Sequence, residues 1–167
     1  MFASIPTILK VVDPVMIATS GARLIEPIAI DCLIDLLLPL ATVITPNLYE
    51  AELLSGKTIQ TYDQACDSAK LLFDRFGCSI VIKGGHLMSE EAVDILYDGK
   101  TVSTFSSPRI SHPLSTHGTG CTFSAAITAQ LAQGKSLHEA VKEAKAYVYR
   151  AIRDSYLVGE EGVAVLR

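Results

Sequence analysis

The sequence predicts an α/β fold with a mostly parallel sheet flanked by helices. Short runs rich in β-branched residues alternate with longer segments in which apolar residues recur at helical spacing. This alternation is typical of parallel strands joined by helices. One pair of runs flanks Asp98-Gly99-Lys100, a hairpin signal that predicts an antiparallel addition to the sheet. No repeat, linker or low-complexity segment interrupts the pattern, so we expect a single domain.

The predicted strands are short and end at turn signals. The first run ends at Asp13-Pro14, the second is stopped by Pro46, and the third ends in Lys83-Gly84-Gly85. Proline pushes the residue before it toward an extended conformation, which here is Thr45. The expected strands cover residues 8–12, 41–44, 79–82, 92–97 and 101–105.

The predicted helices also have recognisable limits. Glu26-Pro27 opens the first helix and Pro39 ends it. Asn47 is suited to cap the second helix, and Gly56 and Gly77 stop the second and third. The remaining expected helices cover residues 48–54, 62–76, 119–132 and 137–155, with Gly134 between the last two.

Composition narrows the class of protein. The 167 residues are 49% hydrophobic and 19% charged, which indicates a globular chain with a sizeable core. A net charge of −4 gives no reason to expect nucleic acid or an anionic membrane as a partner. The most apolar stretch, residues 28–44, is interrupted by acids and a proline, and the N-terminus lacks the pattern of a secretory signal.

The four cysteines contain no C-x-x-C pair. Cys32, Cys66 and Cys78 lie in apolar or helix-patterned surroundings, and we expect them to be buried as small hydrophobic side chains. A reduced, cytoplasmic protein follows as the default expectation.

The segment Thr116-His117-Gly118-Thr119-Gly120-Cys121-Thr122 precedes an apolar helical pattern. Its two glycines let the backbone bend, and Thr119 or Thr122 is suited to cap the helix. The N–H groups of the first turn and the helix dipole would then favour a bound phosphate. The alternative is an ordinary junction between a loop and a helix.

Polar residues follow three of the predicted strands. They are Asp13, residues 45–47, and residues 83–85. Because ligands of open α/β sheets bind beyond the carboxyl ends of the strands, we expect these residues and the glycine turn at one edge.

Two acids are candidates for holding a metal. Asn47 and Glu50 lie one helical turn apart, and Glu50 could organise the waters of Mg²⁺. The alternative is that the two residues form a capping box. Asp13 could likewise hold magnesium, or it could cap the local chain with Thr19 or Ser20.

Lys83 stands at a strand end before two glycines, from where its ammonium could reach phosphates. The alternative is an exposed lysine with no special role. His112 and His138 are expected at the surface, and the residues alone do not assign a role to His86.

Four motifs together resemble a known family. They are D-P-V-M at Asp13–Met16, T-P-N-x-x-E at Thr45–Glu50, K-G-G-H at Lys83–His86 and H-G-T-G-C at His117–Cys121. In this order they resemble the hydroxymethylpyrimidine/phosphomethylpyrimidine kinases of thiamine biosynthesis, which have a ribokinase-like fold. The resemblance extends over essentially the whole chain.

The resemblance implies ATP-dependent phosphorylation of 4-amino-5-hydroxymethyl-2-methylpyrimidine and then of its monophosphate, with Mg²⁺. In this branch of the superfamily a cysteine replaces the usual aspartate as the base, which here is Cys121. A helix N-terminus favours the thiolate that this role requires. The alternative is a buried cysteine packed beneath the helix. A hydrolase pair of His117 and Cys121 is disfavoured, because nothing identifies an orienting partner. The implied sites are catalytic Cys121, Gly118, Thr119 and Gly120, nucleotide-binding Lys83, Thr116, His117 and Asn47, and metal-binding Glu50 and Asp13.

The family is longer at its N-terminus than this chain. Residues 1–167 are therefore expected to be the C-terminal part of a single ribokinase-like kinase domain, with N-terminal strands missing. The phosphate half of the site would be retained, and most of the acceptor half would be absent. The family's members are expected to be homo-oligomers. Residues 158–167 also depart from the family's usual ending.

Two alternatives to the pyrimidine kinase remain. One is pyridoxine or pyridoxal kinase activity, which related enzymes show. The other is a non-catalytic nucleotide-binding remnant, or a subunit that pairs with a separate N-terminal chain.

Overall fold

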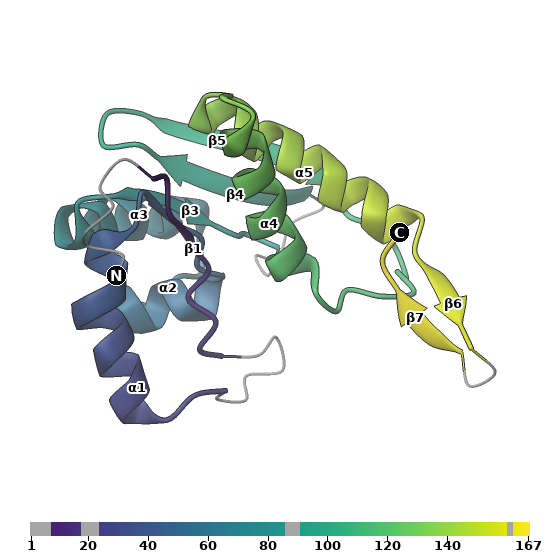
Figure 1. Ribbon diagram of the computed structural model, residues 1–167, viewed down its shortest axis with the longest axis horizontal. Coiled ribbons are helices and arrows are strands. Elements are labelled where there is room, and N and C mark those ends of the chain that lie inside the picture. The colour runs from purple at the N-terminus through teal and green to yellow at the C-terminus, as the bar shows by residue number, and fades with distance from the viewer. Residues whose placement is uncertain (1–7, 18–23, 86–90, 160–161) are drawn as a thin grey trace.

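The computed structural model describes residues 8–17, 24–85, 91–159 and 162–167. Its centre is a five-stranded sheet in the order β1-β2-β3-β4-β5 (Figure 1). The first three strands pair in parallel, and β4 pairs antiparallel with both β3 and β5, so β4 alone runs opposite to the others. The predicted α/β class and the antiparallel hairpin are confirmed. The strands are β1 (Val11–Val12), β2 (Val43–Ile44), β3 (Ser79–Ile82), β4 (Glu91–Tyr97) and β5 (Val102–Pro108).

Five α-helices of the described chain connect or follow these strands. They are α1 (Pro27–Cys32), α2 (Leu48–Ser55), α3 (Tyr62–Phe76), α4 (Thr119–Ala132) and α5 (Leu137–Arg153). Predicted capping is confirmed for α2, which begins at Asn47 and ends at Gly56 in the left-handed conformation. Gly77 ends α3 in the same way.

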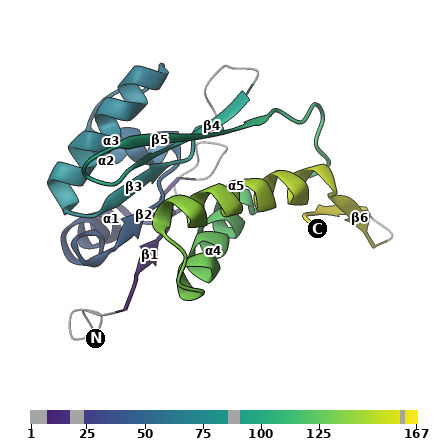
Figure 2. The same cartoon turned by 90° about the horizontal axis from the view of Figure 1, so that it is seen from above.

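The helices form two layers with the sheet between them. Figure 2 shows α2 and α3 on one side of the sheet and α4 and α5 on the other. Successive strand residues alternate between the layers, as a strand's period of two requires. Ile44, Ile80, Ile82 and Ile95 join the core beside α2 and α3. Val43, Val81, Leu96 and Phe105 join the core beside α4 and α5.

The first predicted helix is not one regular α-helix. α1 continues into a π-helical turn, η2 (Leu33–Leu37), and a 3₁₀ turn, η3 (Leu38–Leu40). The N–H of Leu38 donates to the carbonyl of Leu33, one residue further than in an α-helix. Pro39 explains the change, because it has no N–H and its ring displaces the carbonyl four residues earlier.

The C-terminal segment also differs from expectation. The last helix ends at Arg153, two residues before the predicted limit, and a separate hairpin follows. Its strands, β6 (Tyr156–Val158) and β7 (Val163–Val165), project away from the main sheet (Figure 1). Predicting this hairpin would have required a turn signal stronger than the scattered glycines of this segment.

Burial of the cysteines was predicted correctly in two cases of three. Cys66 and Cys78 are buried, whereas Cys32 is exposed. α1 contributes only Ile30 to the buried core, so the helix's other side, which includes Cys32, faces outward. His112 and His138 are exposed as expected.

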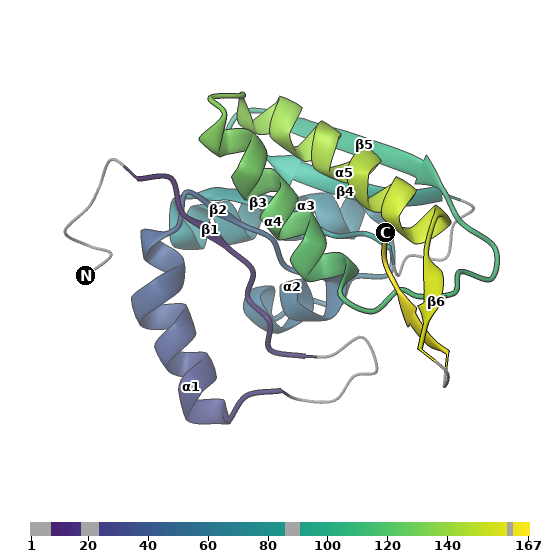
Figure 3. The same ribbon diagram turned by 45° about the vertical axis from the view of Figure 1, so that its right-hand side comes forward.

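β1 forms an edge of the sheet. Within the described residues it pairs only with β2, and Figure 3 shows it beside α1 at one side of the molecule. Several apolar side chains before β1 and along the segment of α1 and η2 are exposed: Ile8, Leu9, Leu24, Ile28 and Leu36. No helix in the described parts of the chain is long and apolar enough to cross a membrane.

Candidate active site

The first three strands end at one edge of the sheet, and their polar residues meet there. Lys83 follows β3 and donates from Nζ to Asp13 Oδ1, which follows β1, at 2.7 Å. The two side chains are only 15% and 14% exposed. The backbone N–H of Lys83 also donates to the carbonyl of Pro46, beyond β2, at 2.9 Å. Lys83 is therefore not the exposed strand-end lysine of the alternative interpretation.

Asn47 and Glu50 form the capping box at the start of α2. Asn47 Oδ1 accepts the N–H of Glu50 at 2.9 Å, and Glu50 Oε2 accepts the N–H of Asn47 at 2.7 Å. Glu50 Oε1 also accepts the N–H of Met16 at 3.3 Å. The carboxylate is buried, at 1% exposure, and this burial raises its pKa above the ordinary value despite those hydrogen bonds. Glu50 thus fastens the segment after β1 to α2.

One carboxylate oxygen of Asp13 has no hydrogen-bond partner in the part of the chain that the structure describes. Oδ1 binds Lys83, but Oδ2 is buried and has no hydrogen-bond partner among the described residues. A buried carboxylate oxygen ordinarily requires a partner. Thr19 and Ser20, the predicted partners for a local cap, lie outside the described residues, as does His86. No group of three or more acidic, histidine or cysteine side chains in the described chain is arranged to hold a metal.

The glycine turn begins α4, but not through a threonine cap. The N-cap is Gly118, with φ of 79° in the left-handed region that favours glycine, and no side chain caps the helix. Thr119 already lies in the first turn, and its hydroxyl donates back to the carbonyl of Thr116 at 3.0 Å. The prediction that Thr119 or Thr122 caps the helix is therefore wrong. Because Gly118 has no side chain that could cap the helix, no capping side chain occupies the N–H groups of the first turn.

Two buried hydroxyls fix the start of α4 against the sheet. Thr45 Oγ1 lies 2.9 Å from Ser124 Oγ, which donates to the carbonyl of Gly120 at 3.1 Å. Gly120 in turn faces Lys83, since a Cβ placed on this glycine would lie 3.2 Å from Lys83 Nζ. Glycine therefore allows the lysine ammonium to approach the helix N-terminus closely.

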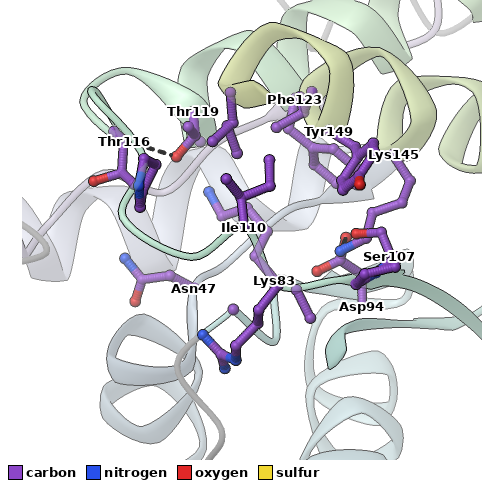
Figure 4. A pocket seen from close by; sticks show the side chains of 18 residues that line it. Asn47, Lys83, Asp94, Ser107, Ile110, Thr116, Thr119, Phe123, Lys145 and Tyr149 are labelled. Carbon is purple, nitrogen blue, oxygen red and sulfur yellow. Dashed lines mark hydrogen bonds and ion pairs between the residues drawn. The ribbon is translucent and has the colours of Figure 1, made fainter. Parts of the chain in front are cut away.

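A cavity of about 440 Å³ opens between this edge and the helices α4 and α5. Figure 4 shows the side chains that line it. Five of the predicted site residues are among them: Asn47, Lys83, Thr116, Thr119 and Gly120. The other five, which are Asp13, Glu50, His117, Gly118 and Cys121, do not line it.

Cys121 lies in the first turn of α4 but is exposed. The alternative of a small cysteine buried beneath the helix is therefore wrong. His117 is also exposed, and its N–H donates to Ser115 Oγ at 3.3 Å. The turn thus separates the cavity, lined by Thr119 and Gly120, from an open surface that carries Cys121.

The sequence did not reveal the wall of the cavity opposite the phosphate-binding residues. Much of this wall is apolar, and it comes from the end of β5, from the segment after it, and from one side of α4 and α5. Its members are Pro108, Ile110, Pro113, Phe123, Val148, Tyr149 and Ile152. The α5 residues belong to the apolar stripe of that helix, which predicts burial but cannot distinguish a core from a cavity wall.

A buried ion pair also lies in the cavity and was not predicted. Lys145 Nζ of α5 lies 2.9 Å from Asp94 Oδ2 of β4. Asp94 Oδ1 accepts the N–H of Gly84 at 3.0 Å. Burial raises the pKa of Asp94, while Lys145 and the Gly84 N–H act in the opposite direction. The available signal was an acidic residue within the apolar run A-V-D-I-L-Y of β4.

Comparison with known proteins identifies the family of this chain. A family model described as phosphomethylpyrimidine kinase matches residues 4–165. The chain belongs to this family. Solved structures of pyridoxal kinase and phosphomethylpyrimidine kinase confirm the ribokinase-like fold expected from the motifs.

Two relatives and one solved structure illustrate the similarity. The hydroxymethylpyrimidine/phosphomethylpyrimidine kinase of Rhizobium meliloti is 48% identical over 143 residues, which are 85% of this chain and 53% of that protein. The pyridoxine kinase of Bacillus subtilis is 45% identical over 148 residues, 87% of this chain and 54% of that protein. The solved structure of the pyridoxal kinase from Staphylococcus aureus in complex with ADP superposes on this chain with a TM-score of 0.84 and 38% sequence identity. The superposition covers 95% of this chain and 57% of the pyridoxal kinase chain. The chain thus spans about half the length of these relatives.

Proposed function

We propose that this chain takes part in transferring the γ-phosphoryl group of ATP to 4-amino-5-hydroxymethyl-2-methylpyrimidine and to its monophosphate. The observation that carries the proposal is the placement of Lys83, Thr119 and Gly120 at one end of a cavity with a largely apolar opposite wall. A nucleotide has the same polarity, with anionic phosphates at one end and a flat base at the other. Family membership supports the choice of reaction.

The cavity is the proposed nucleotide site. The base would lie against apolar side chains such as Ile110, Phe123 and Tyr149, and the phosphates would extend toward Lys83 and the turn. Asn47 and Thr116 line the same space and would contact the phosphates or ribose. Solved relatives bind ADP and AMP-PCP, which supports this assignment.

The exposed side of the turn is the proposed acceptor side. The backbone N–H groups of Gly118, Thr119 and Gly120 would hold the transferring phosphate, as a helix N-terminus suits an anion. Cys121 would accept the proton of the attacking hydroxyl, and its exposure leaves it accessible to a bound substrate. His117, exposed beside it, would contact the phosphates. The turn would thus lie between donor and acceptor, where charge develops during transfer.

Asp13 fits a magnesium ion better than Glu50 does. Asp13 Oδ2 is buried without a partner among the described residues, whereas both oxygens of Glu50 already accept backbone N–H groups. Magnesium is usually held by one or two carboxylates together with waters and substrate phosphates. When bound, Mg²⁺ would neutralise phosphate charge. Glu50 would then act mainly by positioning Asn47 and the segment after β1.

Calorimetry and turnover on the purified chain test the proposal. ATP·Mg²⁺ is titrated first and the hydroxymethylpyrimidine second, and product is measured by mass spectrometry. We expect Lys83→Met to weaken nucleotide binding. We expect Cys121→Ala to lower turnover about 10²–10⁴-fold while nucleotide binding stays unchanged. Lys57→Met and Cys32→Ser are matched controls at exposed positions. Full activity in Cys121→Ala would show that Cys121 is not the base.

Pyridoxal or pyridoxine is the second candidate acceptor. The observation that favours it is the high similarity to the Bacillus subtilis pyridoxine kinase and to the Staphylococcus aureus pyridoxal kinase structures. Comparing kcat/KM for the pyrimidine and for pyridoxal decides between them. Binding of ATP with no turnover of either compound would instead support a nucleotide-binding remnant or a subunit that acts with a second chain.

A further inference from the structure

Asp94 and Lys145 form a buried ion pair between β4 and α5 that none of the proposed chemical steps uses. Their side chains are 7% and 12% exposed, and Nζ lies 2.9 Å from Oδ2. Both residues line the cavity (Figure 4). Burying two charges costs free energy, and an apolar pair of similar size often serves stability as well. A contribution to the stability of the fold is therefore not a sufficient explanation for the Asp94–Lys145 pair.

The other carboxylate oxygen of Asp94, Oδ1, contacts the turn after β3. Oδ1 accepts the N–H of Gly84 at 3.0 Å, and Gly84 directly follows Lys83. The turn lies so close to β4 that a Cβ on Gly84 would overlap the carbonyl oxygen of Val93. Asp94 therefore holds the backbone immediately beside the lysine that reaches Asp13 and Gly120.

Lys145 completes the arrangement from the helix layer. Its Nζ pairs with Asp94 Oδ2, while the charge of Lys83 acts on the same carboxylate from the strand end. Both cations favour the ionised form of Asp94, which accepts a stronger hydrogen bond than a neutral carboxyl. One carboxylate thus connects α5, β4 and the turn after β3.

We propose that Asp94 is a positioning residue that fixes Lys83 for binding the nucleotide phosphates by holding the Gly84 N–H, with Lys145 as its counter-ion. The phosphate role of Lys83 rests on the proposed function, but the positioning of the turn does not. The inference adds two residues to the site, and neither belongs to the four motifs of the sequence.

Two double variants separate positioning from stability. Asp94→Asn with Lys145→Met removes both charges but keeps an oxygen that accepts the Gly84 N–H. Asp94→Leu with Lys145→Met removes the charges and the acceptor while keeping a branched side chain. The exchange of the Gly84 amide hydrogen is followed by NMR, and the KM for ATP and kcat are measured in parallel, with circular dichroism to check folding.

We expect the Asn variant to protect the Gly84 amide nearly as well as the parent chain does, and to raise the KM for ATP less than the Leu variant, because both variants lack the two charges and only the Leu variant lacks the acceptor. The Leu variant should exchange this amide at least about tenfold faster and raise the KM for ATP about tenfold, with a smaller effect on the KM for the acceptor. Should the Leu variant unfold, Asp94→Ala in the same Lys145→Met background removes the acceptor without added bulk.

If the Gly84 amide exchanges at the same rate in the Asn and Leu variants, Asp94 does not hold the turn and the inference is overturned. If the exchange rates differ but the two variants have the same KM for ATP, the turn does not position Lys83, and the inference is overturned as well. If the parent chain neither binds nor uses ATP, the proposed function fails. The exchange comparison would still decide whether Asp94 holds the turn.

Discussion

Lys83 brings together groups from distant parts of the chain. Its ammonium lies against Asp13 from the end of β1 and beside Gly120 at the start of α4, and its neighbour Gly84 is held by Asp94. The charge of Lys83 is already compensated by Asp13. A phosphate arriving at Lys83 would add negative charge near Asp13, so a further cation at Asp13 Oδ2 would favour binding. This charge balance explains why ATP is expected to bind with Mg²⁺ rather than alone.

The four cysteines should differ sharply in reactivity. Cys32 and Cys121 are exposed, whereas Cys66 and Cys78 are buried and burial raises the pKa of Cys78 to about 12. Because the thiolate is the reactive form, iodoacetamide should modify Cys32 and Cys121 in the native protein and spare the other two. Peptide mass spectrometry after brief treatment checks this, with urea-unfolded protein, in which all four react, as the control. Native labelling of Cys78 at the rate of Cys32 would contradict the packing around α3 and β3.

Glu50 should make stability depend on pH in an identifiable way. Its pKa is raised in the folded state by burial, whereas in the unfolded chain a glutamate titrates near about 4.3. Between these two values the folded state binds more protons, so the free energy of unfolding falls as the pH rises through this window. The loss amounts to about 1.4 kcal/mol for each unit by which the pKa is raised.

Glu50→Gln cannot titrate and isolates this effect. Urea unfolding at several pH values, without divalent cations, should show the Gln variant gaining stability relative to the wild type as the pH rises. Glu143→Gln, the same substitution at an exposed position of α5, is measured alongside as the control. A Glu50→Gln difference that does not change with pH would show that the pKa of Glu50 is not raised.

At the scale of the elements, the approach of the turn after β3 to β4 gives a strict requirement for glycine. A Cβ on Gly84 would overlap the Val93 carbonyl oxygen, whereas a Cβ on Gly85 would meet no atom of the described residues within 4 Å. Gly84→Ala should therefore cost about 2–3 kcal/mol or more, since the backbone of β4 must shift. Gly85→Ala should stay within about 0.5 kcal/mol of the wild type. Thermal and urea unfolding of the two variants measure this contrast, and equal stabilities would show that the turn does not lie against β4.

Strand ends and helix caps show how much of the fold can be predicted from the sequence. The strand end, the capping box of Asn47 and Glu50, and the C-terminal glycine of α3 are local signals, and each appears where expected. The cap of α4 was misassigned because the left-handed Gly118 is the N-cap, which places Thr119 and Thr122 at the first and fourth positions of the helix. That distinction depends on backbone geometry rather than on residue type.

Contacts between residues far apart in the sequence could not be predicted from local sequence signals. The Asp94–Lys145 pair joins residues 51 positions apart, and only the packing of α5 on the sheet brings them together. The apolar cavity wall follows from the same packing. Conversely, the convergence of Asp13 and Lys83 was predictable, because parallel strands place their carboxyl ends at one edge.

At the scale of the whole molecule, helices cover the two faces of the sheet, and the described residues pair no further strand with its two edges. β5 and β1 each pair on one side only within the described residues. β5 is mostly polar, with exposed Thr104 and Ser106, as suits an edge in water. The α1 and η2 segment is different, because its apolar residues Ile28 and Leu36 are 75% and 68% exposed.

We predict that the isolated chain self-associates through this apolar surface on the α1 and η2 segment. Ile28 and Leu36 remain exposed although apolar, and removing such surface from water is favourable. Sedimentation velocity of the wild type should show a weight-average sedimentation coefficient that rises with concentration. Ile28→Glu with Leu36→Glu should shift the chain toward monomer by at least about tenfold in the dissociation constant, because each charge would have to be buried. Leu71→Glu, on exposed α3 in the same helix layer, is the matched control and should leave the association unchanged. A monomeric wild type, or equal association of the double variant and the wild type, would contradict self-association through this surface.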